Sequence, residues 1–260
     1  MKLNGNTILI TGAGSGIGLA LAEEFAKLGN QVIVAARSKE KLEGAAEKGL
    51  QTETADVSNL ESIQTLASSV VAKYPALNVV IHNAGISRYE NYLEGVDAEF
   101  EAEMVATNIL GPIRLTNALL PHLLQQESAV VITVSSGLAF MPNAQAPTYS
   151  ATKAAVHSYT ESLRYQLKET NIEVIELVPP YVQTALTGDA QENDPRAMPL
   201  ADYIAEVMQI LKEQSETREI LVERVRELRF SATGGDENYQ AIFKKYNDLI
   251  AAGQATAKRQ

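Results

Sequence analysis

The sequence predicts an α/β protein built on a doubly wound parallel sheet, in three layers of helix, sheet and helix. Short apolar runs rich in Val and Ile alternate with helical stretches of roughly 10 residues or more, the order that gives parallel strands joined by right-handed crossovers. The strands are nearly continuously apolar, as expected when helices cover both faces of a sheet. A glycine-rich turn follows the first strand, as in Rossmann-like folds. Because no repeat or linker divides the chain, we expect one domain over residues 1–260.

The elements of the first half alternate strictly. Residues 7–11 form an apolar, β-branched run, which predicts a buried strand. Apolar residues then recur at helical spacing up to Gly29, a suitable C-cap. The next predicted elements are, in order, a strand over 31–36, a helix around 39–48, a weaker strand around 50–55, a helix from Leu60 that ends before Pro75, and a strand over 77–82.

The second half continues this alternation and then loosens. Beyond Pro179, prolines, Gly188 and acidic residues within 185–200 predict a mobile loop. The predicted elements before and after the loop are, in order, a long helical stretch from about 97 to 125, a strand over 129–135, a helix over 148–170, a strand over 172–178, a helix near 200–214, a strand over 219–222 and a terminal helix.

The terminal helix carries an apolar stripe whose role the sequence leaves open. The stripe either packs on its own domain or covers a partner subunit or the mouth of the active site. Its residues are Tyr239, Ile242, Phe243, Tyr246, Leu249 and Ile250.

Composition excludes several classes of function. The chain has no cysteine, which excludes disulfide scaffolds, thiolate metal sites and a cysteine nucleophile, and its three histidines are scattered, so no metal site is expected. With 22 basic and 32 acidic residues the net charge is −10, which makes nucleic acid and anionic membranes poor partners. No apolar run approaches the roughly 20 residues that cross a bilayer. We therefore expect a cytoplasmic protein without membrane insertion.

The glycine-rich turn over 11–18 points to a nucleotide. Its spacing is T-G-x-x-x-G-x-G, with Gly12, Gly16 and Gly18, and no Lys-Ser/Thr pair follows, which excludes the Walker pattern. Glycines here let the backbone approach a pyrophosphate, and the N-terminus of the following helix offers free N–H groups. A tight turn without a ligand is the alternative, but its position after the first strand favours nucleotide binding.

A second pattern points to acid–base chemistry. Tyr149 and Lys153 lie at i and i+4 on the helix predicted over 148–170, so their side chains share a face. The pKa of a free tyrosine is about 10, and a lysine ammonium near the phenol lowers it. Ser136 stands thirteen residues before Tyr149, at the end of a strand, where its hydroxyl can hydrogen-bond a substrate carbonyl.

Together these motifs resemble the short-chain dehydrogenases/reductases, in their single-domain, non-extended branch. The likeness is carried by TGAGSGIG, ADVS, HNAG, VSSGLAF, YSATK and PPYVQT and by the helical Asn108. It implies an enzyme of class EC 1.1.1.- that transfers a hydride between a nicotinamide cofactor and a carbonyl or alcohol carbon of a small molecule. It also implies that residues 1–135 are mainly the cofactor half and 136–260 the catalytic and substrate half.

The resemblance also assigns roles to single residues. It makes Tyr149 the general acid/base, while Lys153 lowers its pKa and holds the nicotinamide ribose. Ser136 orients the substrate oxygen, and Asn108 holds a water of the proton relay. It also places Asp56 and Val57 at the adenine and Thr184 at the carboxamide. The remaining residues expected to contact the cofactor are Gly12, Ser15, Gly16, Ile17, Gly18, Arg37, Asn83, Ala84, Gly85, Pro179 and Val182.

Two positions depart from the usual family pattern. His82 stands where the family has the first Asn of N-N-A-G, and Pro180 stands where it has the Gly of P-G. Proline lacks an N–H and fixes φ near −65°, so backbone contacts at this turn are expected to differ. The double proline is similar to that of the DltE-type members.

The end of the second strand bears on the choice of cofactor. NAD-binding sites of this fold place an acidic residue there, on the ribose hydroxyls. Here the position is Ala36, followed by Arg37 and Ser38. A guanidinium and a hydroxyl suit a 2′-phosphate, so we expect NADP(H) rather than NAD(H). The alternative is that Arg37 is a solvated loop residue.

Two functional classes and an assembly remain as expectations. The first class is an active carbonyl reductase or alcohol dehydrogenase; the second is a catalytically silent nucleotide-binding sensor or scaffold on the same fold. Because all four catalytic positions are filled, the sequence favours the enzyme. The family implies a homodimer or homotetramer that pairs the two long helices. Some of their apolar residues are expected to face a partner: Leu110, Leu115, Leu119, Val156, Tyr159 and Leu163.

Overall fold

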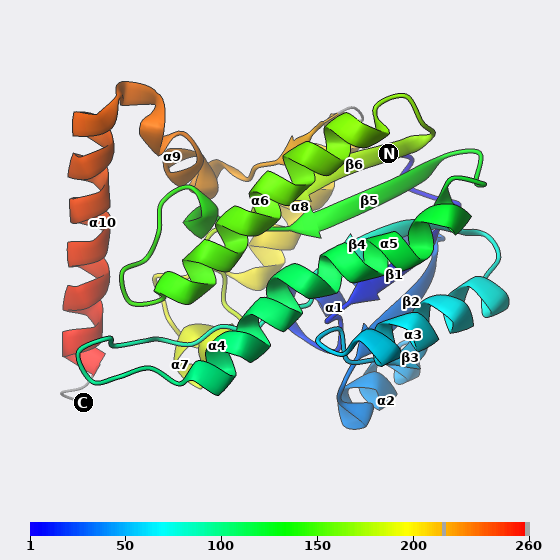
Figure 1. The fold of residues 1–260 in the computed structure, drawn as a ribbon, viewed down its shortest axis with the longest axis horizontal. Coiled ribbons are helices and arrows are strands. Elements are labelled where there is room, and N and C mark those ends of the chain that lie inside the picture. The colour runs from blue at the N-terminus through cyan, green and yellow to red at the C-terminus, as the bar shows by residue number, and fades with distance from the viewer. Residues whose placement is uncertain (215–216, 258–260) are drawn as a thin grey trace.

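The computed structural model describes residues 1–214 and 217–257. It confirms the predicted architecture: a seven-stranded parallel sheet in the order β3-β2-β1-β4-β5-β6-β7, flanked by helices (Figure 1). The strands are β1 (Thr7–Thr11), β2 (Gln31–Ala36), β3 (Gln51–Thr54), β4 (Leu77–His82), β5 (Ala129–Val134), β6 (Ile172–Leu177) and β7 (Glu219–Ile220).

The helices follow the predicted alternation. The α-helices are α1 (Gly16–Lys27), α2 (Lys39–Glu47), α3 (Leu60–Lys73), α4 (Ala98–Val105), α5 (Gly111–Leu123), α6 (Pro147–Leu167), α7 (Asp189–Glu192), α8 (Leu200–Glu213), α9 (Arg226–Arg229) and α10 (Asp236–Ala257). Short 3₁₀ segments are η2 (Gly137–Ala139), η3 (Ala185–Thr187), η4 (Glu223–Val225) and η5 (Ser231–Gly234). Among the described residues, none of these helices has the length and hydropathy of a membrane-spanning segment.

One helical stretch differs from its prediction. The sequence predicts a continuous helix over about 97–125, but α4 and α5 are joined by a π-helical segment, η1 (Ala106–Leu110). Such wider turns interrupt the regular backbone ladder and recur at functional sites. Asn108 lies in this segment, so the irregular turn places a predicted catalytic residue.

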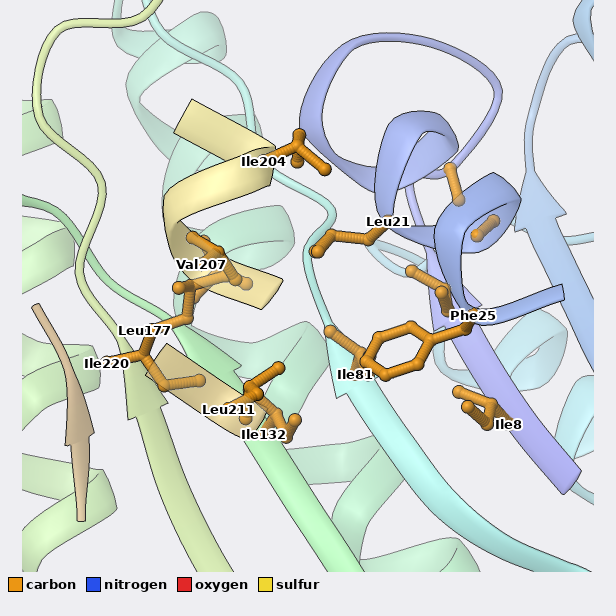
Figure 2. Packing of buried hydrophobic residues seen from close by; sticks show 14 of the residues in the cluster. Ile8, Leu21, Phe25, Ile81, Ile132, Leu177, Ile204, Val207, Leu211 and Ile220 are labelled. Carbon is orange, nitrogen blue, oxygen red and sulfur yellow. The ribbon is translucent and has the colours of Figure 1, made fainter. Parts of the chain in front are cut away.

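Two apolar cores lie on opposite faces of the sheet, because successive residues of a strand point to opposite sides. On β1, Ile8 faces the core formed with α1 and α8, which includes Phe25 and Val207 (Figure 2). Both are fully buried, as is Tyr203 of the same core. Leu9 faces the other core, formed with α3, α5 and α6. The sheet is therefore covered on both faces, as the apolar strands predict.

The strand order reverses at β1, which pairs with β2 on one side and β4 on the other. At such a reversal the connecting helices leave to opposite faces, and a crevice opens beyond the carboxyl ends of the strands. The loops that follow β1, β4 and β5 therefore meet at one edge of the sheet. That edge holds the candidate site.

Four of the six apolar residues from which partner contacts were expected are buried inside their own chain. Leu115, Leu119 and Leu163 are buried in the core between the sheet and the helices of their own chain, and Val156 is buried too, so these four side chains are not available to a second subunit. Their helices pack one side on the sheet, and the apolar periodicity that marks this side says nothing about the outer face. Of the six residues, Leu110 and Tyr159 keep part of their surface exposed.

Candidate active site

The glycine-rich turn between β1 and α1 has the conformation that its glycines predict. Gly12 has φ +66°, and a Cβ there would lie 2.5 Å from the Cα of Ala84 in the loop after β4. Gly16, the first residue of α1, has φ +57°. Only glycine combines this backbone with this close approach. The turn thus holds the free N-terminus of α1 beside the β4 loop.

A cleft of about 420 Å³ opens over this turn. Of the residues predicted to contact a cofactor, all line it except Gly18. Those residues are Gly12, Ser15, Gly16, Ile17, Arg37, Asp56, Val57, Asn83, Ala84, Gly85, Tyr149, Lys153, Pro179, Val182 and Thr184. They come from the ends of five strands and from α6, so the crossover topology brings together residues far apart in the sequence.

Gly18 lies behind the cleft and is required for packing. A Cβ at Gly18 would lie 2.3 Å from Nδ2 of Asn83. That amide donates hydrogen bonds to the carbonyls of Thr11 (3.0 Å) and Gly12 (3.1 Å). Gly18 therefore lets Asn83 fasten the β4 loop to the glycine turn, and its contribution to the cleft is indirect.

Lys41 is a cation of the cleft that was not predicted from the sequence. Lys41 lines it together with Arg37 and Ser38. Its Nζ lies 3.4 Å from the Ser15 hydroxyl, across the opening. Ser38 caps α2 and accepts a hydrogen bond from the Lys41 backbone N–H. The sequence does contain a signal for this position. Ser38 is a typical N-cap residue, and Lys41 is the third residue of the helix that it begins.

Arg37 already has a partner in the structure. Its Nη1 lies 2.8 Å from Oε1 of Glu103 on α4, and both side chains are well exposed. Exposed pairs of this kind contribute little to stability. The pair therefore leaves Arg37 able to turn toward an anion in the cleft.

Tyr149, Lys153 and Ser136 meet at the inner end of the cleft, as the sequence predicts, and all three are buried. Ser136 follows β5 and hydrogen-bonds the phenol of Tyr149. The Nζ of Lys153 lies 5.5 Å from the centre of the Tyr149 ring and donates to the carbonyl of Val134 (2.8 Å). The three side chains form one polar group in an apolar wall.

The pKa values of this group differ from the simplest expectation. Burial raises the pKa of the Tyr149 phenol, and the hydrogen bond to Ser136 only partly opposes this. Burial lowers the pKa of Lys153 to about 8, while the negative charge of Glu176 acts in the opposite direction. In the protein alone, desolvation therefore outweighs the lysine charge at the phenol, because the ammonium is bonded to Val134 and not to the phenolic oxygen.

Asn108 does not line the cleft but supports its floor. Its Oδ1 accepts from the N–H of Ile86 (2.9 Å), and its Nδ2 donates to the Ile86 carbonyl (3.0 Å) and to Oγ1 of Thr152 (3.0 Å). Thr152 precedes Lys153 on α6. Both amide hydrogens are therefore used to join the β4 loop to α6, and a relay water would need another donor than this side chain.

A second cavity of about 540 Å³ adjoins the cleft at Ser136 and Tyr149. The two share Ser136, Tyr149, Pro179, Pro180, Leu186 and Gln191. Leu138 and Tyr181 line this cavity, whereas the nearby Met141 is fully buried and Phe140 packs on His157. Tyr149 thus stands at the junction of two pockets.

Helix α10 supplies one wall of the second cavity. Tyr246, Leu249 and Ile250 line it, although α10 stands at one end of the molecule, away from the sheet (Figure 1). Asn247 fixes the helix there: its Oδ1 accepts from the N–H of Ala144 (2.7 Å), and its Nδ2 donates to the carbonyl of Pro142 (3.2 Å). Of the two interpretations of the apolar stripe, the structure supports a cover at the active-site mouth.

The loop over 185–200 forms part of the same junction. It contains η3 and α7, and Gln191 is buried, with its Nε2 donating to the Val182 carbonyl (2.9 Å) and to Oγ1 of Thr184 (3.2 Å). A bridge also joins Val182 to Met198. The predicted mobility of this loop stays a prediction.

His82, the first departure from the family pattern, is structural. It is buried at the end of β4, and its Nε2 lies 2.8 Å from Oγ1 of Thr116 on α5. Burial lowers its pKa to about 4. The ring is therefore neutral at physiological pH and joins the sheet to α5.

This histidine predicts a loss of stability in mild acid. The unfolded chain has a histidine pKa near 6.5, so it binds a proton that the folded chain refuses. The neutral ring of His82 contributes to the free energy of unfolding in full above about pH 6.5. This contribution, up to about 3 kcal/mol, is lost as the pH falls toward 4. We expect His82→Asn to flatten the dependence of Tm on pH over this range. The partly exposed His122→Asn is the control; equal slopes for wild type and His82→Asn would contradict the assignment.

The chain resembles known proteins in sequence and in fold. Residues 6–195 match a family model described as short chain dehydrogenase. The oxidoreductase DltE of Bacillus subtilis is 38% identical over 253 residues, which cover 95% of this chain and 98% of that relative.

Two solved structures show the same architecture. A 3-ketoacyl-(acyl-carrier-protein) reductase from Brucella melitensis, complexed with NADH, has a TM-score of 0.75 and 29% identity, over 83% of this chain and 93% of that chain. A short chain dehydrogenase from Burkholderia cenocepacia, in complex with NADP, has a TM-score of 0.81 at 24% identity, over 94% and 99% of the two chains. The second likeness is one of fold.

Proposed function

The chain belongs to the short-chain dehydrogenase family, and from that membership we propose that it is an NADP(H)-dependent oxidoreductase that interconverts a carbonyl compound and its alcohol. The observation that carries the proposal is the position of Tyr149, with Ser136, at the junction of the glycine-lined cleft and an apolar cavity. A cofactor in the first pocket and a substrate in the second would meet at its phenol.

The cleft fits a dinucleotide. Positive-φ glycines and the N-terminus of α1, which has no side-chain cap, suit the pyrophosphate, because they leave backbone N–H groups free to bind it. Asp56 and Val57 would lie at the adenine end, and Thr184 and Lys153 at the nicotinamide end. When bound, the nicotinamide supplies or accepts the hydride. Of the two solved structures described above, one is complexed with NADH and the other with NADP, so the fold accommodates both cofactors. We therefore infer the cofactor preference of this chain from the residues that follow β2.

The protein's own groups handle the proton. Ser136 and Tyr149 can both donate hydrogen bonds to the substrate oxygen. In the reductive direction Tyr149 gives its phenolic proton to that oxygen, and in the oxidative direction it takes a proton from the alcohol. The ammonium of Lys153 stabilises the phenolate that remains, an effect made larger by the low polarity of the pocket.

The second cavity indicates the substrate class. Its wall is mainly apolar and includes the rings of Tyr89, Tyr181 and Tyr246. Three charged residues also line it: Arg196, Arg224 and Glu227. Arg196 pairs with Asp194 at 2.7 Å, and Arg224 and Glu227 carry opposite charges, so the wall has no large net charge. We infer an uncharged, largely apolar carbonyl compound with room for several carbons beyond the reacting group.

Turnover tests the proposed function directly. A panel of aldehydes, ketones and diketones of increasing chain length should oxidise NADPH, followed by absorbance, with kcat/KM rising with apolar length. Calorimetry with NADP⁺ and NADPH gives cofactor binding independently. Binding without turnover on any panel member would favour the silent sensor, and no binding of either nucleotide would exclude both.

Tyr246→Ala should raise KM for the best apolar substrate about 10-fold and leave kcat and cofactor affinity nearly unchanged. The reason is that the ring contributes contact area to the cavity wall but does not touch the reacting atoms. Phe243→Ala is the matched control, since Phe243 stacks on Tyr239 on the same helix, with ring centres 6.3 Å apart, and does not line the cavity. If both variants raise KM equally, α10 is not part of the substrate site.

The proposal includes a homodimer or homotetramer in the cytoplasm. Leu110 and Tyr159 remain partly exposed on the long helices, and Val105 and Tyr165 add exposed apolar surface on α4 and α6. An isologous pairing of these helices would cover it. Sedimentation equilibrium at micromolar concentration should give at least twice the chain mass of 28.1 kDa; a monomer mass would contradict the assembly.

A further inference from the structure

A buried carboxylate lies behind the catalytic lysine. Glu176 is the fifth residue of β6 and is fully buried. It pairs in register with Thr133 of β5, whose hydroxyl meets that of Thr160 on α6 at 2.7 Å. Neighbouring register partners of a parallel sheet point to the same face. Glu176 therefore lies under α6, the helix that carries Tyr149 and Lys153.

Its two oxygens have different surroundings. Oε2 lies 2.8 Å from Nδ1 of His157, whereas Oε1 is buried and has no hydrogen-bond partner in the described part of the chain. A buried carboxylate with one unpaired oxygen is costly, and its charge needs compensation nearby.

Lys153 is a buried cation and therefore needs a negative charge nearby. It is buried, and its Nζ donates a hydrogen bond to the carbonyl of Val134, the residue after the register partner of Glu176. Lys153 and His157 are four residues apart on α6, so their side chains are neighbours. His157 touches Glu176, and Lys153 therefore lies one helical turn from the same carboxylate.

We propose that Glu176 is a positioning residue: its buried charge, held in place by His157, keeps the ammonium of Lys153 charged and in place beside Tyr149. The assignment rests on the proposed function for the use made of Lys153, but the pairing itself does not depend on it.

The direction of the pKa of Lys153 supports this pairing. Burial lowers it to about 8, and Glu176 raises it against that effect. Without the carboxylate the pKa of Lys153 would fall further, because burial would then act unopposed by Glu176. The phenol of Tyr149, whose pKa burial already raises, would then lose its nearby positive charge at a lower pH.

His157 makes the pairing sensitive to pH. Its pKa is raised, first by the hydrogen bond to Glu176 and further by Glu219, against burial and the charge of Arg229. Glu161, one turn along α6, also approaches it and is bonded to Arg164. When His157 is protonated it neutralises Glu176. Once His157 loses its proton, the carboxylate acts on Lys153 alone, so the lysine is then held more strongly for as long as it stays charged.

The proton of Lys153 can be followed without any substrate. Lysine labelled with ¹³C at Cε reports its charge by NMR, and Lys153→Arg assigns the resonance. In the full-length wild type we expect a midpoint near 8. In Glu176→Gln, which keeps the shape and removes the charge, we expect a midpoint lower by about one pH unit or more. Glu161→Gln removes an exposed carboxylate near His157 and should move the midpoint by less than about 0.3.

Two further measurements keep the proposal falsifiable. Glu176→Asp retains the charge and should restore most of the wild-type midpoint, so it serves if the glutamine variant folds poorly. In turnover, Glu176→Gln should lower kcat several-fold with KM for the carbonyl unchanged. An unshifted Lys153 midpoint in a folded Glu176→Gln protein would overturn the pairing. A shifted midpoint in a protein that turns over no carbonyl would support it and reject the proposed function.

Discussion

Replacing Tyr149 by Phe should lower kcat by a factor of about 10² to 10⁴ and leave the affinity for NADPH near that of the wild type. The phenolic hydroxyl supplies the proton, whereas the ring supplies surface to both pockets, and Phe keeps the ring. In the terms of mutant kinetics, the lost interaction is made in the transition state and not with bound cofactor. Steady-state kinetics with one panel substrate and calorimetric titration of NADPH give the two numbers.

Tyr165→Phe is the matched control, because it removes a hydroxyl from the same helix on a well-exposed side chain. It should keep wild-type kcat and affinity. Lys153→Met should differ from Tyr149→Phe by weakening cofactor binding as well as turnover, since Lys153 lines the cleft. If Tyr149→Phe keeps more than about a tenth of the wild-type kcat, the acid/base assignment is wrong.

Sequence patterns predicted most of the helices and strands, because these elements are determined largely by residues that are close together in the sequence. The bounds of β1, β2 and β4 match their predictions, since each is a short apolar run bounded by turn residues. The strand predicted over 219–222 is only two residues long, because β7 lies at the sheet edge and pairs on one side with β6. The π-helical turn at Asn108 left no sign in the apolar period, which continues through it.

In the candidate site, too, the residues with a local sequence pattern could be predicted and those placed by long-range contacts could not. Tyr149 and Lys153 share a helical face, and the glycine turn has its own spacing, so both could be found from the sequence. Lys41 reaches the cleft only through the approach of α2 to the glycine turn, where its Cβ would lie 2.9 Å from a Cβ at Gly14. The contribution of α10 to the cavity depends on contacts of Asn247 more than 100 residues away in the chain.

The wild type should prefer NADPH over NADH by roughly 10- to 150-fold in kcat/KM, the ratio expected for one to two charge-assisted contacts to a phosphate in a half-exposed site. Ala36 offers no carboxylate for the ribose hydroxyls, and Arg37 and Lys41 line the same end of the cleft. Two cations placed there stabilise a bound 2′-phosphate dianion, whereas they contribute little to the binding of an unphosphorylated ribose.

Separate variants apportion this preference. Arg37→Ile combined with Ala36→Asp should shift the ratio toward NADH, because it removes a donor and adds a repelling charge. Lys41→Met should weaken NADPH and leave NADH nearly unchanged. Lys39→Met is its control, since Lys39 is exposed on the same helix and does not line the cleft.

The ion pair of Arg37 with Glu103 adds a test with the opposite sign. To reach a phosphate, the guanidinium must leave a carboxylate oxygen 2.8 Å away. Glu103→Gln removes that competitor, so it should tighten NADPH binding by up to about 5-fold, the worth of one exposed ion pair. It should leave NADH affinity unchanged, because a neutral ribose makes no demand on Arg37. The measurement is the Kd of each cofactor by calorimetry. A wild-type ratio that favours NADH, or a Glu103→Gln variant that tightens both cofactors equally, would show that Arg37 does not read the phosphate.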